Sequence, residues 1–337
     1  MQLSTVWFLL VGFLFVGYAI LDGFDLGAGA VHLIVARNDS ERRQVLNAIG
    51  PVWDGNEVWL VTGGGALFAA FPTVYGTVFS GFYLAMMMLL GAIILRATSI
   101  EFRSKETAAW WRRSWDVGFS VSSALAAILF GVALGNVLRG LPIEADGAYH
   151  GGLIGLLNPF AIAVGVLTLA MAVLQGSAWL TIKTEGALQA RARTTGVAAV
   201  VLVVAAWIAA TALAWADARR VFDNFGNLLA WVGPFLTANV LIYLIVAMRS
   251  RRDSRTFFLS SLSVVTFAIT AGIALYPNLV PAVDKVRSLT VDNAHSSDTT
   301  LIVMLVVAII GMPIVLAYTS FVYWKFKGKV RLDEASY

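Results

Sequence analysis

Cysteine is absent from this sequence of 337 residues, and histidine occurs only three times. Without cysteine the chain can form no disulfide, no thiolate zinc site and no cysteine-ligated iron–sulfur cluster. Charged residues are also scarce at 13%, against about 25% in a typical soluble protein. Disorder does not explain this scarcity, because disordered chains are poor in apolar residues, whereas 59% of this chain is hydrophobic. The lipid bilayer is therefore the expected solvent for most of the sequence.

Nine long apolar runs account for this composition. Each has roughly the 20 residues that a helix needs to cross a hydrocarbon core of about 30 Å. They cover residues 4–36, 52–71, 77–96, 115–138, 155–181, 195–216, 227–248, 256–276 and 299–325. The connections between the runs are too short to form a core of their own. We therefore predict an all-α, polytopic membrane protein with nine transmembrane helices, and a single integral membrane domain over residues 1–337.

Basic residues are distributed unevenly over the connections between these runs. Of the 24 Lys and Arg residues, 19 fall in one alternate set, which includes the C-terminal segment, and five fall in the other set. Lys and Arg accumulate in the cytoplasmic loops of membrane proteins. The bias therefore predicts that the N-terminus lies outside and the C-terminus inside. It also explains the net charge of +4 without nucleic-acid binding.

Two pairs of short segments suggest an internal repeat. The pairs are residues 19–23 with 172–176, and residues 131–134 with 272–275. The members of each pair lie four spans apart, as expected for two parallel four-helix halves. We therefore expect possible repeat halves at 1–140 and 153–280, each forming a four-helix bundle, with the ninth helix at 299–325 added to them.

Two pairs of carboxylates lie in the first two spans. Asp22 and Asp25 are three residues apart in the first span, and Asp54 and Glu57 repeat this spacing at the start of the second. Residues three apart share one side of a helix, and the alternation of spans places both pairs near the inner face. Ionisable groups inside a membrane are costly and are candidates for function, and carboxylates can load and release protons. These four residues are therefore candidates for a path for protons or cations.

Structural roles explain the same carboxylates. Asp54 follows a proline at a helix start, where an acidic side chain can cap the helix and complement its dipole. Asp22 and Asp25 can bind a partner arginine, and for these two the residues alone favour a role in interhelical structure. For Asp54 both interpretations stay open. Asp116, at the inner start of the fourth span, is expected to be a capping or interfacial residue.

Glycines four residues apart mark a packing surface on the first span. Gly23 and Gly27 occupy successive turns beside the paired carboxylates. Small residues at this spacing let two helices approach closely in a membrane. We therefore expect this part of the first span to cross a neighbouring helix at short distance.

The chain offers few ligands for haem. Haem iron is usually bound by His, Met, Cys or Tyr. His150 and His295 fall in predicted outer loops, which leaves His32 as the histidine within a span. A lone histidine in a span is more often hydrogen-bonded or interfacial than an iron ligand. We therefore expect neither a haem site nor a metal site in this chain.

Several motifs, in order along the chain, resemble subunit II of cytochrome bd-type quinol oxidases. The motifs are DGFDLG at 22–27, WDGNEVW at 53–59, GGGALFAA at 63–70, FSGFY at 79–83, FRSK at 102–105 and LNPF at 157–160. The similarity extends over nearly the full length and is densest in the first hundred residues. Together these motifs are far more specific than any one alone.

The resemblance implies a place in a respiratory complex of the bacterial inner membrane. In this family subunit I carries two b-type haems, haem d and the quinol site, and a small single-helix subunit often joins the pair. Quinol is oxidised near the outer face, and oxygen is reduced to water with protons from the cytoplasm, without pumping. Subunit II is needed for assembly. The chain is accordingly expected to be a haem-free, non-catalytic subunit that contacts subunit I, lipids and quinone.

The resemblance also carries over to individual residues. The acidic residue of the family's Trp-Asp-Gly-Asn motif, here Asp54, is implicated in proton uptake, and the Asp-Gly-Phe-Asp pair corresponds to Asp22 and Asp25. Some members have an amide where this chain has Glu57, so a second ionisable group is expected at the entry point here. Residues expected to lie beside the pathway are Trp53, Asn56 and Trp59.

Without the resemblance, a proton- or cation-coupled secondary transporter is the main alternative. Paired carboxylates within spans and a possible repeat both fit a transporter. A purely structural subunit is a third possibility. A transporter should act alone in liposomes, whereas an oxidase subunit should co-purify with a haem-bearing partner.

Overall fold

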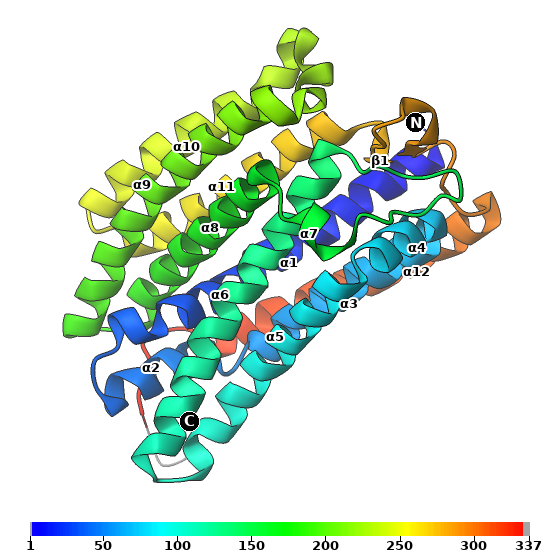
Figure 1. Ribbon diagram of the computed structural model, residues 1–337. Coiled ribbons are helices and arrows are strands. Elements are labelled where there is room, and N and C mark those ends of the chain that lie inside the picture. Colours follow the sequence, from blue (N-terminus) through cyan, green and yellow to red (C-terminus); the bar gives the residue numbers. More distant parts are fainter. Residues whose placement is uncertain (1, 333–337) are drawn as a thin grey trace.

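The computed structural model describes residues 2–332, which are mostly helical (Figure 1). Within these residues, eight helices are long and apolar enough to cross a membrane. Two of them are counted together with the short 3-10 turns η1 (Arg103–Lys105) and η3 (Leu228–Trp231). These eight are α1 (Leu3–Val35), α5 (Tyr83–Phe102), α6 (Ala109–Arg139), α8 (Pro159–Lys183), α9 (Gly186–Asp217), α10 (Val232–Arg249), α11 (Asp253–Leu275) and α12 (Asp298–Lys325).

The second predicted span is a broken helix. α3 (Trp53–Ala70) is followed after one residue by α4 (Pro72–Gly81), with a bend of 119° between them. Pro72 has no N–H to donate and disfavours a helical conformation at the residue before it, so α3 ends and α4 begins there. Counted together, the two helices form a ninth candidate span. The third span was predicted to begin at residue 77, but α4 takes the residues up to Gly81 and α5 begins only at Tyr83.

A short helix lies between the first two spans, where the apolar runs predict none. α2 (Asp39–Ile49) begins with a reciprocal cap: the Asn38 side chain accepts from the Glu41 N–H at 2.9 Å, and the Glu41 carboxylate accepts from the Arg37 N–H at 2.7 Å. Burial alone raises the pKa of Glu41, but the hydrogen bond from the Arg37 N–H and the Arg191 guanidinium lower its pKa below the ordinary value. The cap fixes where the chain turns after α1.

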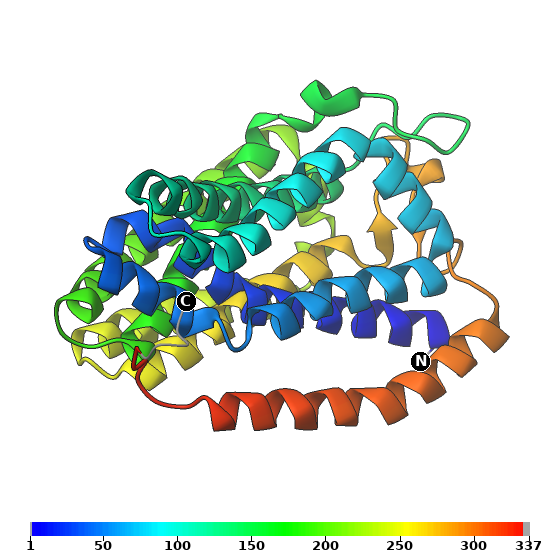
Figure 2. The ribbon, with the colours of Figure 1, turned by 90° about the horizontal axis from the view of Figure 1, so that it is seen from below.

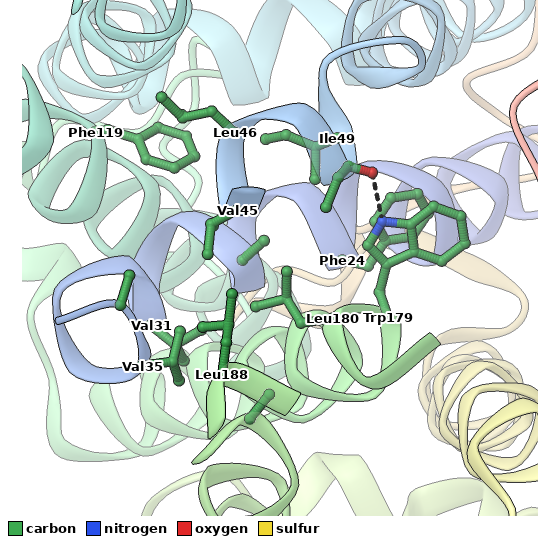
Figure 3. Packing of buried hydrophobic residues seen from close by; sticks show 14 of the residues in the cluster. Phe24, Val31, Val35, Val45, Leu46, Ile49, Phe119, Trp179, Leu180 and Leu188 are labelled. Carbon is green, nitrogen blue, oxygen red and sulfur yellow. Dashed lines mark hydrogen bonds between the residues drawn. The ribbon is translucent and has the colours of Figure 1, made fainter. Parts of the chain in front are cut away.

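The apolar face of α2 packs against α1 and α8 in the core shown in Figure 3. The Trp179 indole donates to the carbonyl of Ala48 at 2.9 Å, and its ring stacks on Phe24 with 4.4 Å between the ring centroids. These contacts hold α2 against α8 and α1.

Besides α2, α8 packs more extensively against four helices: α1, α6, α9 and α11 (Figure 1). At the crossing of α1 and α8, a Cβ atom on Gly27 would overlap the carbonyl oxygen of Ala172, and one on Gly176 would overlap the backbone of α1 at Gly27 and Ala28. The close packing predicted for Gly27 is therefore confirmed. At Gly23 a Cβ would meet nothing within 4 Å, so this glycine does not make the close approach.

Loops at the other end of the bundle form a small cap. Its elements are α7 (Gly152–Leu156), η2 (Arg219–Gly226), η4 (Lys285–Arg287) and the antiparallel strands β1 (Asn278–Val280) and β2 (Leu289–Thr290). Arg220 donates to the carbonyl of Ala282 at 2.7 Å, and Arg287 donates to the carbonyl of Ile143 at 3.1 Å. The cap thus joins three connections that are far apart in sequence.

α12 runs along the outer edge of the bundle (Figure 2), and only 6% of its most apolar 18-residue stretch is buried. It is attached mainly at its ends. Near its start the Trp7 indole donates to the carbonyl of Leu301 at 3.0 Å, and after its end Lys329 donates to the carbonyls of Thr181 and Thr184 at 3.0 and 2.8 Å. The predicted nine-helix count, the orientation of the termini and the division into repeat halves remain predictions.

Candidate functional site

A buried arginine lies between the carboxylates of the first two predicted spans. Arg96, on α5, has a side chain that is 1% exposed; its Nη1 lies 2.6 Å from an oxygen of Asp22, and its Nη2 lies 3.2 Å from an oxygen of Glu57. Arg96 stands at the end of the third predicted span, 77–96, and is one of the 19 basic residues that were assigned to one set of connections. The structure corrects this assignment, because α5 continues beyond Arg96 to Phe102 and the Arg96 side chain is buried.

Asp25 lies one turn along α1 from Asp22, and both carboxyl groups are fully buried. The Asn56 side-chain amide donates to one oxygen of Asp25 at 2.7 Å, and the second oxygen has no hydrogen-bond partner among the described residues. Together with Glu57, three carboxyl groups face one guanidinium. The site therefore carries an excess of up to two negative charges unless its carboxyl groups hold protons, and burial disfavours that excess.

Asp54 lies apart from this buried group. It is exposed in the first turn of α3, one turn before Glu57. The residue that precedes the helix is Val52, and no side chain caps this helix start in the described chain. Capping by a hydrogen bond is therefore the wrong interpretation of Asp54, although its charge still complements the helix dipole.

The three residues expected beside the pathway surround the same helix start. Asn56 is 1% exposed and bonds to Asp25, as described above. Trp59 is buried against α1, where it packs beside Tyr18, and Trp53 is partly buried at the edge of the core formed with α2. The structure thus brings Asp22, Asp25, Glu57 and Asn56 together and leaves Asp54 at the surface.

A second ionic cluster binds four helices together near the ends of α1 and α5. Its centre is Asp116, which accepts from Arg103 at 2.6 Å and from Arg42 at 2.9 Å and lies 2.8 Å from the His32 ring. Asp39 extends the cluster through a contact of 2.8 Å with Arg103. Asp116 is fully buried, so the expectation of a capping or interfacial residue was wrong. It joins α1, α2, α6 and the end of α5.

We predict that Asp116→Asn lowers the stability of the protein. The amide carries no charge to compensate Arg103, which is 1% exposed, and loss of a hydrogen bond between charged groups costs about 1.5–3 kcal/mol. The melting temperature of the purified complex measures this effect. Asp217→Asn is the control, because its ion pair with Arg139 is exposed and such pairs contribute about 0–1 kcal/mol. Equal melting temperatures for the two variants would contradict the prediction.

The histidines of this chain do not fit a haem site. His32 is fully buried, bonds to Asp116 through Nε2 and packs edge-on against Phe119, so no space remains for a macrocycle beside it. It is the hydrogen-bonded residue that the sequence led us to expect. His150 and His295 are exposed in loops. Within residues 2–332, no group of three or more His, Cys, Asp or Glu side chains is arranged to bind a metal ion.

Comparisons with known proteins agree with this architecture. The family model of cytochrome bd terminal oxidase subunit II matches residues 3–326. The chain is 37% identical to cytochrome bd-I ubiquinol oxidase subunit 2 of Escherichia coli (strain K12), over 98% of this chain and 96% of that protein. It is 35% identical to the probable cytochrome oxidase subunit 2 of Haemophilus influenzae, over 97% and 95% of the two chains.

The fold also matches a solved structure. A chain in the structure of bd oxidase from Geobacillus thermodenitrificans superposes with a TM-score of 0.79 at 16% identity, over 97% of this chain and 99% of that chain. At this identity the match concerns the fold alone. The match of the family model over nearly the whole chain, with the identities of the two relatives, shows that the protein belongs to the family of cytochrome bd terminal oxidase subunit II.

Proposed function

We propose that this chain is the haem-free subunit of a quinol:oxygen oxidoreductase, and that it stabilises subunit I and delivers cytoplasmic protons for the reduction of oxygen to water. Membership of the family supports a role as a multi-pass subunit of a quinol oxidase complex. It also favours an oxidase subunit over the alternative of a secondary transporter. The E. coli relative is named as a ubiquinol oxidase subunit, and we extend that reaction to the complex that contains this chain.

The haems belong to subunit I in this proposal. Two b-type haems and haem d would supply the electron transfer and the oxygen chemistry there, and the histidines of this chain are unsuited to bind them, for the reasons given above. We further propose that a small single-helix subunit joins the complex, that the complex lies in the bacterial inner membrane with lipids and quinone around it, and that the N-terminus of this chain is outside.

The observation that supports proton delivery is that the exposed fraction of the four carboxyl side chains decreases from the surface to the interior. Asp54 is exposed, the Glu57 side chain is 16% exposed, and Asp22 and Asp25 are fully buried. Successive carboxyl groups are one helical turn apart or share the Arg96 guanidinium. Such a series can accept a proton at the surface and pass it inward, because each carboxyl group exchanges protons with its neighbour directly or through water.

Arg96 has a defined part in this path. Its single positive charge offsets one of the three carboxylates, so the group is neutral only when two protons reside on it, and it keeps one negative charge when it holds a single proton. A path that holds protons at rest can release one inward when the oxygen site demands it and take up another at Asp54. The guanidinium cannot itself give up its proton, and it therefore keeps two carboxyl groups close without competing for the transferred proton.

We predict that Asp54→Asn leaves the haem content of the purified complex unchanged and slows its oxygen consumption. Loss of a positioned proton-transfer group should reduce turnover on the order of tenfold or more. The measurement is oxygen uptake with quinol, together with the optical spectrum of the complex. Asp298→Asn is a matched control, because Asp298 is also an exposed acid in the first turn of a long helix. Turnover like that of the unmodified complex in Asp54→Asn would overturn the proposed entry point.

A further inference from the structure

Tyr323, in the last turn of α12, reaches from the edge of the bundle to the buried carboxylates. Its hydroxyl donates to the side-chain oxygen of Asn56 at 2.7 Å. The Asn56 amide nitrogen in turn donates to Asp25 at 2.7 Å. Two hydrogen bonds therefore connect the outermost helix to a carboxyl group that has no exposed surface.

The Tyr323 ring is held in place by aromatic packing. Its centroid lies 5.9 Å from that of Trp179 and 6.4 Å from that of Phe24, and both contacts are edge-to-face. Phe24 immediately precedes Asp25 on α1, so the ring and the carboxyl group are positioned by the same segment. Most of α12 is unburied, which makes this contact one of its few attachments to the interior.

The hydrogen bond from Tyr323 determines which way the Asn56 amide faces. Because the side-chain oxygen of Asn56 accepts from Tyr323, its NH₂ group faces Asp25 and donates to it. The second amide hydrogen points to the carbonyl of Leu21 at 3.3 Å. An NH₂ donor favours the ionised carboxyl group. In the reversed orientation the amide oxygen would face Asp25, and only a protonated carboxyl group could donate to it.

We propose that Tyr323 is a positioning residue for proton exchange at Asp25, acting through the orientation of the Asn56 amide. A phenol hydroxyl is a better donor than acceptor, because its oxygen lone pairs are delocalised into the ring, so Tyr323 favours the orientation in which the amide oxygen faces it. While it donates to the oxygen, the ionised state of Asp25 is favoured, and the bound proton is released more readily. This inference rests on the proposed function, because Asp25 is one of the carboxyl groups of the suggested path.

The test is the Tyr323→Phe variant in the intact oxidase complex. Phenylalanine keeps the ring contacts with Phe24 and Trp179 but leaves the Asn56 oxygen without its donor. Facing phenylalanine, the amide has one end unpaired in either orientation, so the bias toward the observed orientation is lost. We therefore expect the reversed amide, which pairs with a protonated Asp25, to become populated and Asp25 to retain a proton more often. At a given pH the ratio of protonated to ionised Asp25 should rise about tenfold, the equivalent of one hydrogen bond to a charged group.

Infrared spectroscopy measures this ratio through the carboxylic-acid C=O band that disappears in Asp25→Asn. Tyr318→Phe is the matched control, because Tyr318 lies on the same helix with 67% of its surface exposed; it should leave the band unchanged. An assembled Tyr323→Phe complex with an unchanged band, or an equal change in Tyr318→Phe, would overturn the inference.

A second variant tests the route through Asn56 and serves if Tyr323→Phe yields little complex. Asn56→Leu removes the amide, so it should raise the protonated fraction of Asp25 by itself. Adding Tyr323→Phe to Asn56→Leu should then have no further effect, whereas an additional tenfold rise would exclude transmission through the amide. A stronger C=O band of Asp25 with undiminished oxygen consumption would support the positioning role of Tyr323 and contradict proton delivery through Asp25. This outcome separates the two proposals.

Discussion

Replacing Arg96 with leucine is expected to abolish stable assembly of the oxidase complex. The substitution leaves Asp22 and Glu57 without the guanidinium that lies 2.6 and 3.2 Å from their oxygens. Removing one partner of a buried ion pair costs about 3–5 kcal/mol, which is a large part of the 5–15 kcal/mol that holds a typical protein folded. The measurement is the amount of haem-containing complex recovered after solubilisation, together with its melting temperature.

Two further substitutions separate charge from packing at this position. Arg96→Lys keeps the charge but cannot bridge two carboxyl groups with a planar fork, so we expect an intermediate yield. Arg96→Leu combined with Asp22→Leu should recover part of the loss, because replacing both partners of a buried pair is often tolerated. Arg113→Leu is the control, since Arg113 is exposed at the same end of the bundle. A full yield from Arg96→Leu would show that the carboxyl groups are already protonated and need no cation.

Much of the helical architecture could be predicted because it depends on local composition. Runs of about 20 apolar residues mark eight helices correctly in place and type, with ends that differ by several residues. The elements that were missed depend on other signals. α2 is amphipathic and short, so a search for long apolar runs passes over it, although the cap formed by Asn38 and Glu41 is visible in the sequence. The second predicted span ends at residue 71, just before Pro72, so the continuation of the chain as α4 was not predicted.

The candidate site was predictable in part for the same reason. Carboxylates within apolar runs stand out individually, so Asp22, Asp25 and Glu57 could be chosen without knowing their neighbours. Their partners could not be chosen, because Arg96 lies 74 residues from Asp22 and Tyr323 lies 267 residues from Asn56. Arg96 also resembled an ordinary loop arginine, because it stands where the apolar run ends.

The two glycines of the first span illustrate the same limit and lead to the second large effect. Their spacing predicts close helix packing for both, but only Gly27 lies at the crossing with α8. We expect Gly27→Ala to destabilise the protein by more than about 3 kcal/mol, the upper end for an overpacked core. The added methyl group would overlap backbone atoms of α8 at Ala172. Backbone cannot rotate away as a side chain can, so the two helices must separate.

Gly23→Ala is the matched control for this prediction. Gly23 lies one turn earlier on the same helix, and a Cβ atom there meets nothing within 4 Å. Because alanine favours a helix over glycine by about 1 kcal/mol, this variant should be as stable as the unmodified protein or slightly more so. Melting temperatures of the purified complexes distinguish the two variants. An equal decrease of the melting temperature in both variants would contradict this prediction. The loss would then arise from the flexibility of α1 near its carboxylates, and not from the close crossing of α1 and α8.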